Sequence, residues 1–363
     1  MAKVSLILPI YNVSRYLREC LDSVVSQSLS DLEILCVNDG STDNSLDIIQ
    51  EYAAKDPRIV VITGPNGGYG KAMNKGLNRA TGEYVGIVEP DDYVVPEMFE
   101  TLYRAAAEHD LDLVKADFYR FTRDGDGTEH LTYIFLDETK KRYNQLLCPA
   151  EDPSCLYFTL NTWSGIYRRE FLEQHHIRHH ETPGASFQDN GFFFQTFVHA
   201  RRAMILNTPL YRNRRDNPNS SVASKEKVYC MNVEYDYIRD LLMEDRAIWE
   251  RFQSMYWWCK YQNYMFTHSR IADHYKQEYM DRMAQEYKRA AQLGQLKKED
   301  FAPDQWRTIQ SMISGANGYV SRITSSRLVR SLSPYIPMKV KKAAVSALRS
   351  AVKALKKTGG AEK

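Results

Sequence analysis

The sequence predicts an α/β protein built on a mostly parallel sheet with helices on both faces. Residues 1–120 alternate short runs rich in Val and Ile with segments whose apolar residues recur at helical spacing. Each strand-like run is bounded by Asn, Asp, Gly or Pro, as strands commonly are. Because a repeated strand–helix unit favours parallel pairing, these two observations together predict the fold class.

The expected elements follow in regular order. The expected strands are Val4–Tyr11, Glu33–Val37, Arg58–Thr63, Glu83–Val88 and, further on, Asp112–Phe121. The expected helices are Arg15–Ser26, Thr42–Ala54 and Lys71–Ala80, with Ser41 placed to cap the second. Residues 226–315 are expected to be mainly helical and are unusually aromatic, so we predict a C-terminal helical extension.

Composition excludes several classes of protein. The chain has 363 residues, 43% hydrophobic and 26% charged, which is ordinary for a globular protein and unlike a disordered or collagen-like one. The apolar run Val4–Ile10 falls far short of the roughly 18 residues of a membrane-spanning helix and lacks a signal peptide's cleavage pattern. We therefore expect a cytoplasmic location. The six cysteines form no Cys-x-x-Cys pair, which predicts neither a disulfide framework nor a zinc cage.

The charge is divided unevenly along the chain. Residues 319–363 hold eleven Lys and Arg but only one acid, Glu362, so this tail carries +10 and residues 1–318 carry −8. On a helical projection Val345, Leu348, Val352 and Leu355 share one side and basic residues occupy the other. A basic amphipathic helix suits the inner face of the cell membrane, whereas the alternative is a solvated terminus with some packing on the body. The tail lacks interleaved aromatics, so nucleic-acid binding is not expected.

Polar residues follow the expected strands where an open parallel sheet binds ligands. They are Tyr11-Asn12, Asn38-Asp39-Gly40 and Glu89-Pro90-Asp91-Asp92. Such residues can also serve only turns and caps. The carboxylates of the third cluster suit Mg²⁺ or Mn²⁺ held together with the phosphates of a nucleoside diphosphate. The glycine-rich segment Gly64–Gly70 lacks the spacing of phosphate-binding motifs and is interpreted as a flexible turn.

Four ordered motifs in this region resemble those of the family 2 glycosyltransferases. They are Val4–Asn12 (VSLILPIYN), Val37–Ser45 (VNDGSTDNS), Asn74–Tyr84 (NKGLNRATGEY) and Glu89–Asp92 (EPDD). The resemblance covers the first 120 residues strongly and residues 160–222 more loosely. It implies a GT-A fold, a nucleotide-sugar donor (usually a UDP-sugar), Mn²⁺ or Mg²⁺, and inversion at the anomeric carbon.

The resemblance also implies which residues hold the donor. Tyr11 matches the position that stacks on the base, and Asp39 the one that accepts from the uracil ring N–H. The complete implied set for the donor is Pro9, Tyr11, Asn12, Asp39, Lys71, Glu89 and Asp91, and the implied metal ligands are Asp91 and Asp92. Lys71 is included in this set because Met73 stands where an Arg is frequent in the family, and Lys71 can supply the donor contact instead. The sequence also departs from the pattern at Asn38 and at Glu89-Pro90, where Asp and Asp-Ser are usual.

A later segment, Phe187–Phe194 (FQDNGFFF), resembles the family motif of Glu-Asp before an aromatic run, with Gln188 in place of Glu. By that match Asp189 is the catalytic base, a role that displacement of a nucleoside diphosphate by a sugar hydroxyl requires of one carboxylate. The alternative is that Asp189 only caps the helix beginning near Asn190. The Arg-rich segment Tyr211–Ser221 suits either closure over a diphosphate or a solvated turn.

The predicted organisation is a glycosyltransferase domain at 1–225, a helical extension at 226–318 and the basic tail at 319–363. Residues 1–120 form its nucleotide-sugar-binding half and 121–225 its acceptor and catalytic half. The predicted function is transfer of a sugar to a saccharide or lipid-linked saccharide acceptor in cell-surface polysaccharide or lipopolysaccharide assembly.

The altered Glu89-Pro90 and Gln188 motivate an alternative, a catalytically silent nucleotide-sugar-binding protein. Nucleotidyl transfer is disfavoured because no basic Gly-rich loop follows the first strand. The histidines His175, His176, His179 and His180 are assigned no metal.

Overall fold

The computed structural model describes residues 2–314 except 186 and 221–223; the predicted basic tail lies outside the described residues. The strands are β1 Val4–Ile10, β2 Leu32–Asn38, β3 Ile59–Thr63, β4 Tyr84–Ile87, β5 Tyr93–Val94, β6 Leu113–Arg123, β7 Glu129–Ile134, β8 Gly165–Arg168 and β9 Ala203–Arg214. The helices are α1 Ser14–Val25, α2 Ser45–Ala53, α3 Tyr69–Arg79, α4 Met98–Glu108, α5 Arg169–Gln174, α6 Asp189–His199, α7 Cys230–Glu244, α8 Arg246–Arg270, α9 Asp273–Gln292 and α10 Pro303–Ile313, with 3₁₀ turns at Pro153–Tyr157 and Lys298–Asp300.

The strands of the described chain form one nine-stranded sheet in the order β3-β2-β1-β4-β8-β6-β9-β5, with β7 paired to β6. The first four strands are parallel, whereas β8 runs antiparallel to both β4 and β6. The parallel register of β1 and β2 ends with Ile10 opposite Asn38, so their carboxyl ends are level. The polar residues that follow these strands therefore come to one edge.

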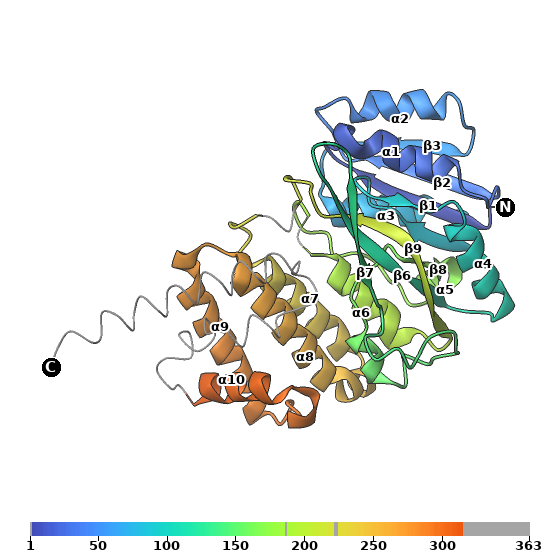
Figure 1. Ribbon diagram of the computed structural model, residues 1–363. Coiled ribbons are helices and arrows are strands. Elements are labelled where there is room, and N and C mark those ends of the chain that lie inside the picture. Colours follow the sequence, from blue (N-terminus) through green and yellow to red (C-terminus); the bar gives the residue numbers. More distant parts are fainter. Residues whose placement is uncertain (1, 186, 221–223, 315–363) are drawn as a thin grey trace. The chain divides into compact units, whose positions relative to one another are not determined.

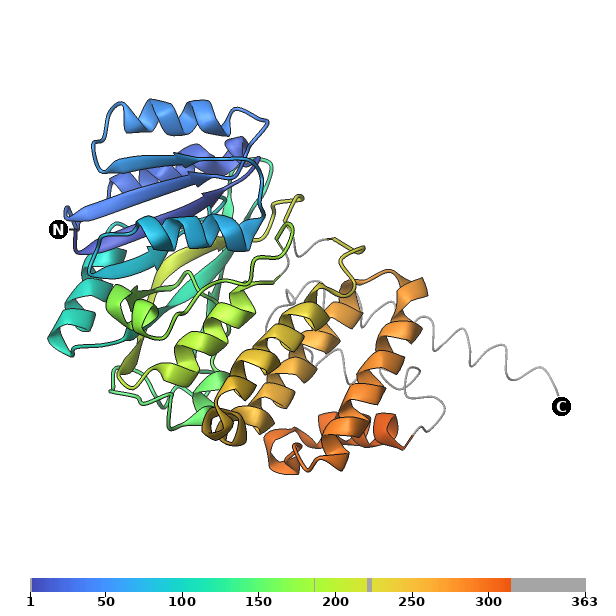
Figure 2. The same ribbon diagram turned by 180° about the vertical axis from the view of Figure 1, so that it is seen from behind.

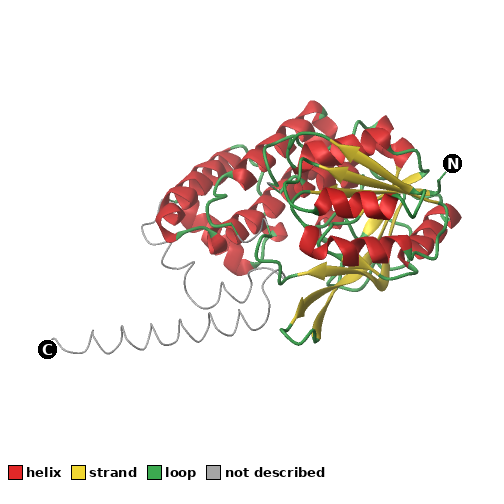
Figure 3. Cartoon of the chain, turned by 90° about the horizontal axis from the view of Figure 1, so that it is seen from above, coloured by secondary structure: helices red, strands yellow, loops and turns green. Residues whose placement is uncertain are grey.

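Helices cover both faces of this sheet (Figures 1 and 2). The helices α1, α2 and α4 lie on one face, and α3, α5 and α6 on the other. A view from above shows the sheet between its helical layers (Figure 3). This arrangement follows from strand order, since right-handed crossovers outward from β1 to β3 and back to β4 place their helices on opposite faces. The predicted α/β class with helices on both faces is confirmed.

The core forms because the central strands are apolar on both faces. All seven residues of β1 are buried, as expected for a parallel strand between two layers. On α1 the buried residues are Leu17, Cys20, Leu21 and Val24, which recur at the helical spacing that the sequence displays. The helix α1 therefore buries the face that its periodicity predicts.

One local expectation was wrong: Ser41 does not cap the second helix. The helix α2 begins at Ser45, and Asn44 is its N-cap residue. The hydroxyl of Ser41 instead accepts a hydrogen bond of 3.1 Å from the backbone N–H of Asn12. The side chain thus joins the loop after β2 to the loop after β1.

The described part of the chain divides into two compact units: residues up to 220 together with 233–248, and residues 224–232 together with 249–314. The described part of the second unit is helical with an aromatic interior. Tyr261, Tyr264, Tyr279 and Tyr287 are almost fully buried there, and the Tyr287 hydroxyl donates to the carbonyl of Trp257 at 2.7 Å. Buried Lys260 pairs with Glu286 at 2.9 Å. Among the described residues no helix has the length and apolarity to cross a membrane.

Candidate active site

The loop after β1 presents Tyr11 and anchors itself through Asn12. Tyr11 is 51% exposed, which leaves its ring available to a ligand. Asn12 adopts the left-handed conformation (φ 49°), which Asn tolerates better than most residues. Its Oδ1 accepts from the backbone N–H of Thr42 at 2.7 Å and of Asp43 at 3.3 Å. The side chain of Asn12 thus shapes the site by joining two loops.

The carboxylate of Asp39 holds the glycine-rich segment. It accepts from the N–H of Gly67 at 2.9 Å and of Gly68 at 2.8 Å, and it is 3% exposed. Gly68 has φ 89°, and an added Cβ would lie 2.7 Å from the N of Gly184. The segment interpreted as a flexible turn is therefore fixed by Asp39 on one side and packed closely on the loop before α6 on the other.

Two other predicted donor residues occupy different environments. Pro9 is buried in β1, past the four residues that pair with β4. There its missing N–H does not interrupt that pairing. Lys71 is exposed on α3, and its side chain lies against Gly67. The structure thus places Lys71 beside the segment that Asp39 holds.

Glu89 follows β4 and has a raised pKa. Its Oε1 accepts from the Tyr69 hydroxyl at 2.8 Å, and its backbone N–H donates to the Tyr211 hydroxyl at 3.0 Å. Burial raises the pKa of Glu89 to about 8, and the negative charges of Asp91 and Asp189 add to that rise. The charges of Asp91 and Asp189 therefore both act on the carboxyl group of Glu89.

Asp91 and Asp92 are adjacent in sequence but have different partners. Asp91 is partly exposed, and its Oδ2 accepts from Asn217 Nδ2 at 2.8 Å. Asp92 is 2% exposed, and its two oxygens accept from the backbone N–H of Arg214 at 2.6 Å and from Asn213 Nδ2 at 3.0 Å. Asp92 thus fastens β9 to the loop after β4. The metal-ligand role expected of Asp92 stays a prediction, because each of its oxygens accepts one hydrogen bond and keeps a second lone pair.

Asp189 is the first residue of α6, and Gln188 at the N-cap makes no side-chain cap. Asp189 Oδ1 accepts from the backbone N–H and the side-chain amide of Asn190, both at 3.1 Å. Burial raises the pKa of Asp189. Its charge in turn acts on Glu89 and Tyr69, so the predicted base lies at the same edge as the predicted donor residues.

Asn74 holds this site together, although the sequence pattern gave it no role. Asn74, inside a recognised motif, accepts from the N–H of His179 and donates to its carbonyl, both at 2.9 Å. It also donates to Glu181 Oε1 at 2.9 Å. Asn74 therefore fastens the loop before α6 to α3. Its place in the motif was the signal that the sequence offered, but its partner His179 lies 105 residues away along the chain.

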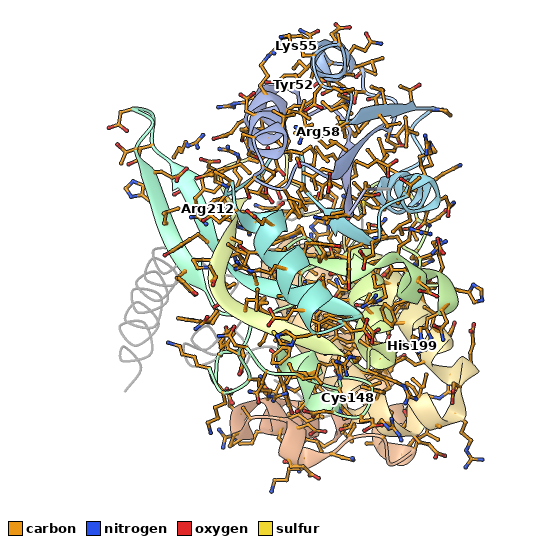
Figure 4. All side chains as sticks on the ribbon, turned by 90° about the vertical axis from the view of Figure 1, so that its right-hand side faces the viewer. Tyr52, Lys55, Arg58, Cys148, His199 and Arg212 are labelled. Atoms are coloured by element: carbon orange, nitrogen blue, oxygen red, sulfur yellow. The ribbon has the colours of Figure 1, made fainter. Side chains whose placement is uncertain are left out.

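The Arg-rich segment is largely committed to the protein itself. Arg212 lies on β9 (Figure 4), donates to the carbonyl of Pro209 at 2.9 Å and lies over the ring of Tyr119. Arg214 is 7% exposed, pairs with Glu19, and donates to the carbonyl of Asp91 at 2.8 Å. Neither arginine points freely into solvent, and Arg214 supports the backbone of Asp91.

The histidines have separate roles. His179 is buried and stacks on Phe192 with ring centroids 4.4 Å apart. His175 stacks in the same way on His199, labelled in Figure 4, at 4.4 Å. His180 pairs with Glu234 at 3.0 Å. Within the described ranges, no group of three or more His, Cys, Asp or Glu side chains is arranged to hold a metal ion.

Comparison with known proteins relates the chain to a large family. Residues 5–175 match the family model described as glycosyl transferase family 2. The uncharacterized glycosyltransferase EpsJ of Bacillus subtilis is 37% identical over 223 residues, covering 60% of this chain and 62% of that protein. The uncharacterized glycosyltransferase YibD of Escherichia coli is 31% identical over 242 residues, covering 65% of this chain and 68% of that protein.

A solved structure shares the fold. Staphylococcus aureus TarS 1-349, crystallised in complex with UDP-GlcNAc, aligns with a TM-score of 0.58 at 21% identity, covering 86% of this chain and 92% of that one. The predicted GT-A fold is confirmed by this similarity.

The match does not extend over whole relatives: the chain spans about 60% of the length of the first curated relatives, 62% for EpsJ and 60% for the putative glycosyltransferase EpsH of Bacillus subtilis. The coverage of YibD exceeds two thirds at 31% identity, and the family motifs meet at one edge of the sheet. The chain therefore belongs to glycosyl transferase family 2.

Proposed function

We propose that the protein transfers a sugar from a UDP-sugar to a saccharide or lipid-linked saccharide acceptor, with inversion, in the assembly of a cell-surface polysaccharide or lipopolysaccharide. The observation that carries the proposal is the link from Glu89 to the start of α6: the Tyr69 hydroxyl donates to Glu89 at 2.8 Å, and the Gly184 carbonyl accepts from Tyr69 N–H at 3.1 Å and from Gln188 Nε2 at 3.0 Å, next to Asp189. One of these carboxylates can accept a proton from the acceptor hydroxyl while another lies beside the diphosphate. Related proteins named as chondroitin and hyaluronan synthases support a saccharide acceptor.

Asp189 serves as the general base. The acceptor hydroxyl oxygen bonds to the anomeric carbon, the bond from that carbon to the diphosphate oxygen breaks, and the hydroxyl proton passes to Asp189. Attack from the face opposite the leaving group inverts the configuration. Burial raises the pKa of Asp189, which makes its carboxylate a stronger proton acceptor than an exposed aspartate.

The donor binds between the loops after β1 and β2. Tyr11 offers an exposed ring for stacking on the base. Asp39 can accept from the base N–H while it holds the Gly67–Gly68 backbone, because each carboxylate oxygen has two lone pairs. The UDP and UDP-GlcNAc complexes of TarS support a uridine nucleotide, and UDP-GlcNAc is the first donor to test.

Asp91 fits a divalent cation better than Asp92 does. Asp91 is partly exposed and uses one oxygen for Asn217, whereas both oxygens of Asp92 are engaged by β9. Mg²⁺ and Mn²⁺ are often held by one or two carboxylates together with substrate phosphates, so a single protein carboxylate suffices when the donor supplies the rest. When bound, the ion would offset charge on the departing diphosphate.

Release of UDP from a panel of UDP-sugars tests the proposal. Wild-type protein with Mn²⁺ should release UDP from at least one UDP-sugar, and that sugar should raise the thermal midpoint because it binds the native state. Stabilisation without UDP release, even with oligosaccharide acceptors present, would instead support the catalytically silent binding protein. Neither stabilisation nor release would contradict both.

A further inference from the structure

The first turn of α6 is held from outside by a buried carboxylate on α7. The backbone N–H of Gly191 donates to Glu234 Oε1 at 2.9 Å, and Glu234 is 1% exposed. The first N–H groups of a helix have no partner within the helix. A carboxylate at that end stabilises the turn by its hydrogen bond and by its attraction to the helix dipole. Because Gln188 makes no side-chain cap, Glu234 performs this task for α6.

The second oxygen of Glu234 fixes the loop that precedes α6. His180 Nδ1 lies 3.0 Å from Glu234 Oε2. The same imidazole stacks on Tyr237, with centroids 4.0 Å apart and planes at 13°. Glu234 and Tyr237 are one helical turn apart, so one face of α7 contacts both the loop and the start of α6.

Gly191 permits this approach. A Cβ at this position would fall inside van der Waals contact with Glu234 Oε1 and would lie 3.2 Å from Tyr237 Cε1. The glycine costs helix propensity in the first turn of α6, and the close approach of α7 gives it a physical reason. Glu234 therefore reaches the backbone two residues beyond Asp189.

Charge also links the two carboxyl groups. The ionisable side chains coupled to Asp189 are Glu89 after β4, Tyr69 on α3 and Glu234 on α7. Burial raises the pKa of Glu234, the His180 contact opposes that rise, and the charge of Asp189 adds to it.

We propose that Glu234 is a positioning residue for the reaction: it holds the first turn of α6 and thereby aims the carboxylate of Asp189. The inference rests on the proposed function for its catalytic part. It places a requirement for catalysis on α7, which lies outside residues 5–175 of the family match.

Hydrogen exchange of the full chain tests the structural part without any assay of activity. In Glu234→Ala the peptide that contains Gly191 should exchange roughly tenfold faster or more, because its amide loses its acceptor. In Glu234→Gln the exchange rate of this peptide should stay near that of wild type, since the side-chain amide oxygen can still accept from the N–H of Gly191. Glu244→Gln, at an exposed carboxylate on the same helix, is the control. Wild-type protection in Glu234→Ala would overturn the proposal.

The rate of UDP release from UDP-GlcNAc tests the catalytic part. In Glu234→Ala the kcat should fall about 10- to 100-fold through misalignment of the base, while the KM for UDP-GlcNAc stays near that of wild type. In Glu234→Gln the kcat should stay near that of wild type, because the amide oxygen can still accept from the N–H of Gly191. A wild-type kcat in Glu234→Ala, or an equal fall of kcat in both variants, would overturn the catalytic role. Absence of UDP release in wild type, with exchange as expected, would count against the proposed function rather than the hold on α6.

Discussion

At the residue scale, the adjacent side chains Asp91 and Asp92 illustrate how partners decide a role. The motif makes both residues equivalent candidates for metal binding, because a pattern of letters records type and spacing only. The structure separates them: Asp92 is buried and accepts a hydrogen bond from β9 at each oxygen, and Asp91 keeps exposure to solvent. The separation depends on the backbone of Arg214, 122 residues away, which no local pattern could predict.

Substitution of each aspartate by asparagine should give opposite results. Asp91→Asn should weaken Mn²⁺-dependent UDP binding and leave stability nearly unchanged, because the proposed function assigns the carboxylate of Asp91 to the ion. Asp92→Asn should lower the free energy of unfolding by about 1–3 kcal/mol, because its amide would face a buried donor. Calorimetry with UDP, with and without Mn²⁺, and urea unfolding measure the two effects. Equal loss of metal-dependent binding in both variants, with no loss of stability, would contradict the assignment.

At the element scale, the sequence predicted elements better than it predicted the links between them. The strands around β1, β2, β3 and β4 lie within a few residues of their expected positions, because their apolar content and polar boundaries are local signals. Ser41 does not cap the helix, and its hydroxyl accepts instead from the backbone N–H of Asn12 in another loop. Asn74 and Glu234 could not be predicted as site residues for a similar reason, because their partners lie far along the chain.

The link between α3 and the loop before α6 can be broken at one residue. Asn74→Ala should lower the free energy of unfolding by about 1–3 kcal/mol, because the buried N–H and carbonyl of His179 lose their partner. Urea unfolding measures the change. Asn78→Ala, at an exposed position on the same helix, is the matched control and should cost nothing. Equal stability of Asn74→Ala and wild type would refute the role of this link.

The stacked pair His175 and His199 predicts loss of stability in acid. Burial lowers the pKa of His199 from 6.5 to about 4, with the charge of His175 acting in the same direction. A group with a lowered pKa binds its proton more readily when unfolded, so its contribution is complete above pH 6.5 and is lost as the pH falls toward 4. His199→Gln should flatten the dependence of the urea midpoint on pH over this window. His176→Gln, at an exposed position, should not; identical pH dependence in all three proteins would count against this explanation.

At the scale of the whole molecule, the basic tail gives the chain a charge distribution that its net charge of +2 conceals. The tail lies outside the described residues, so its role stays a prediction from sequence. Each Lys or Arg near an anionic surface contributes about 1 kcal/mol to attachment. Deletion of residues 336–363 should therefore abolish flotation with anionic vesicles at low salt and leave UDP release intact. If full-length protein does not float, and the deletion instead lowers the thermal midpoint, the tail packs on the protein.

In the proposed reaction Asp189 removes the acceptor proton at a site built by the carboxyl edge of the sheet. The most direct measurement compares wild type and Asp189→Asn in UDP release from the best UDP-sugar and in affinity for UDP. The rate should fall roughly 10²- to 10⁴-fold, the usual contribution of a general base, while UDP affinity stays nearly unchanged. A wild-type rate in Asp189→Asn, with the acceptor saturating, would contradict the account.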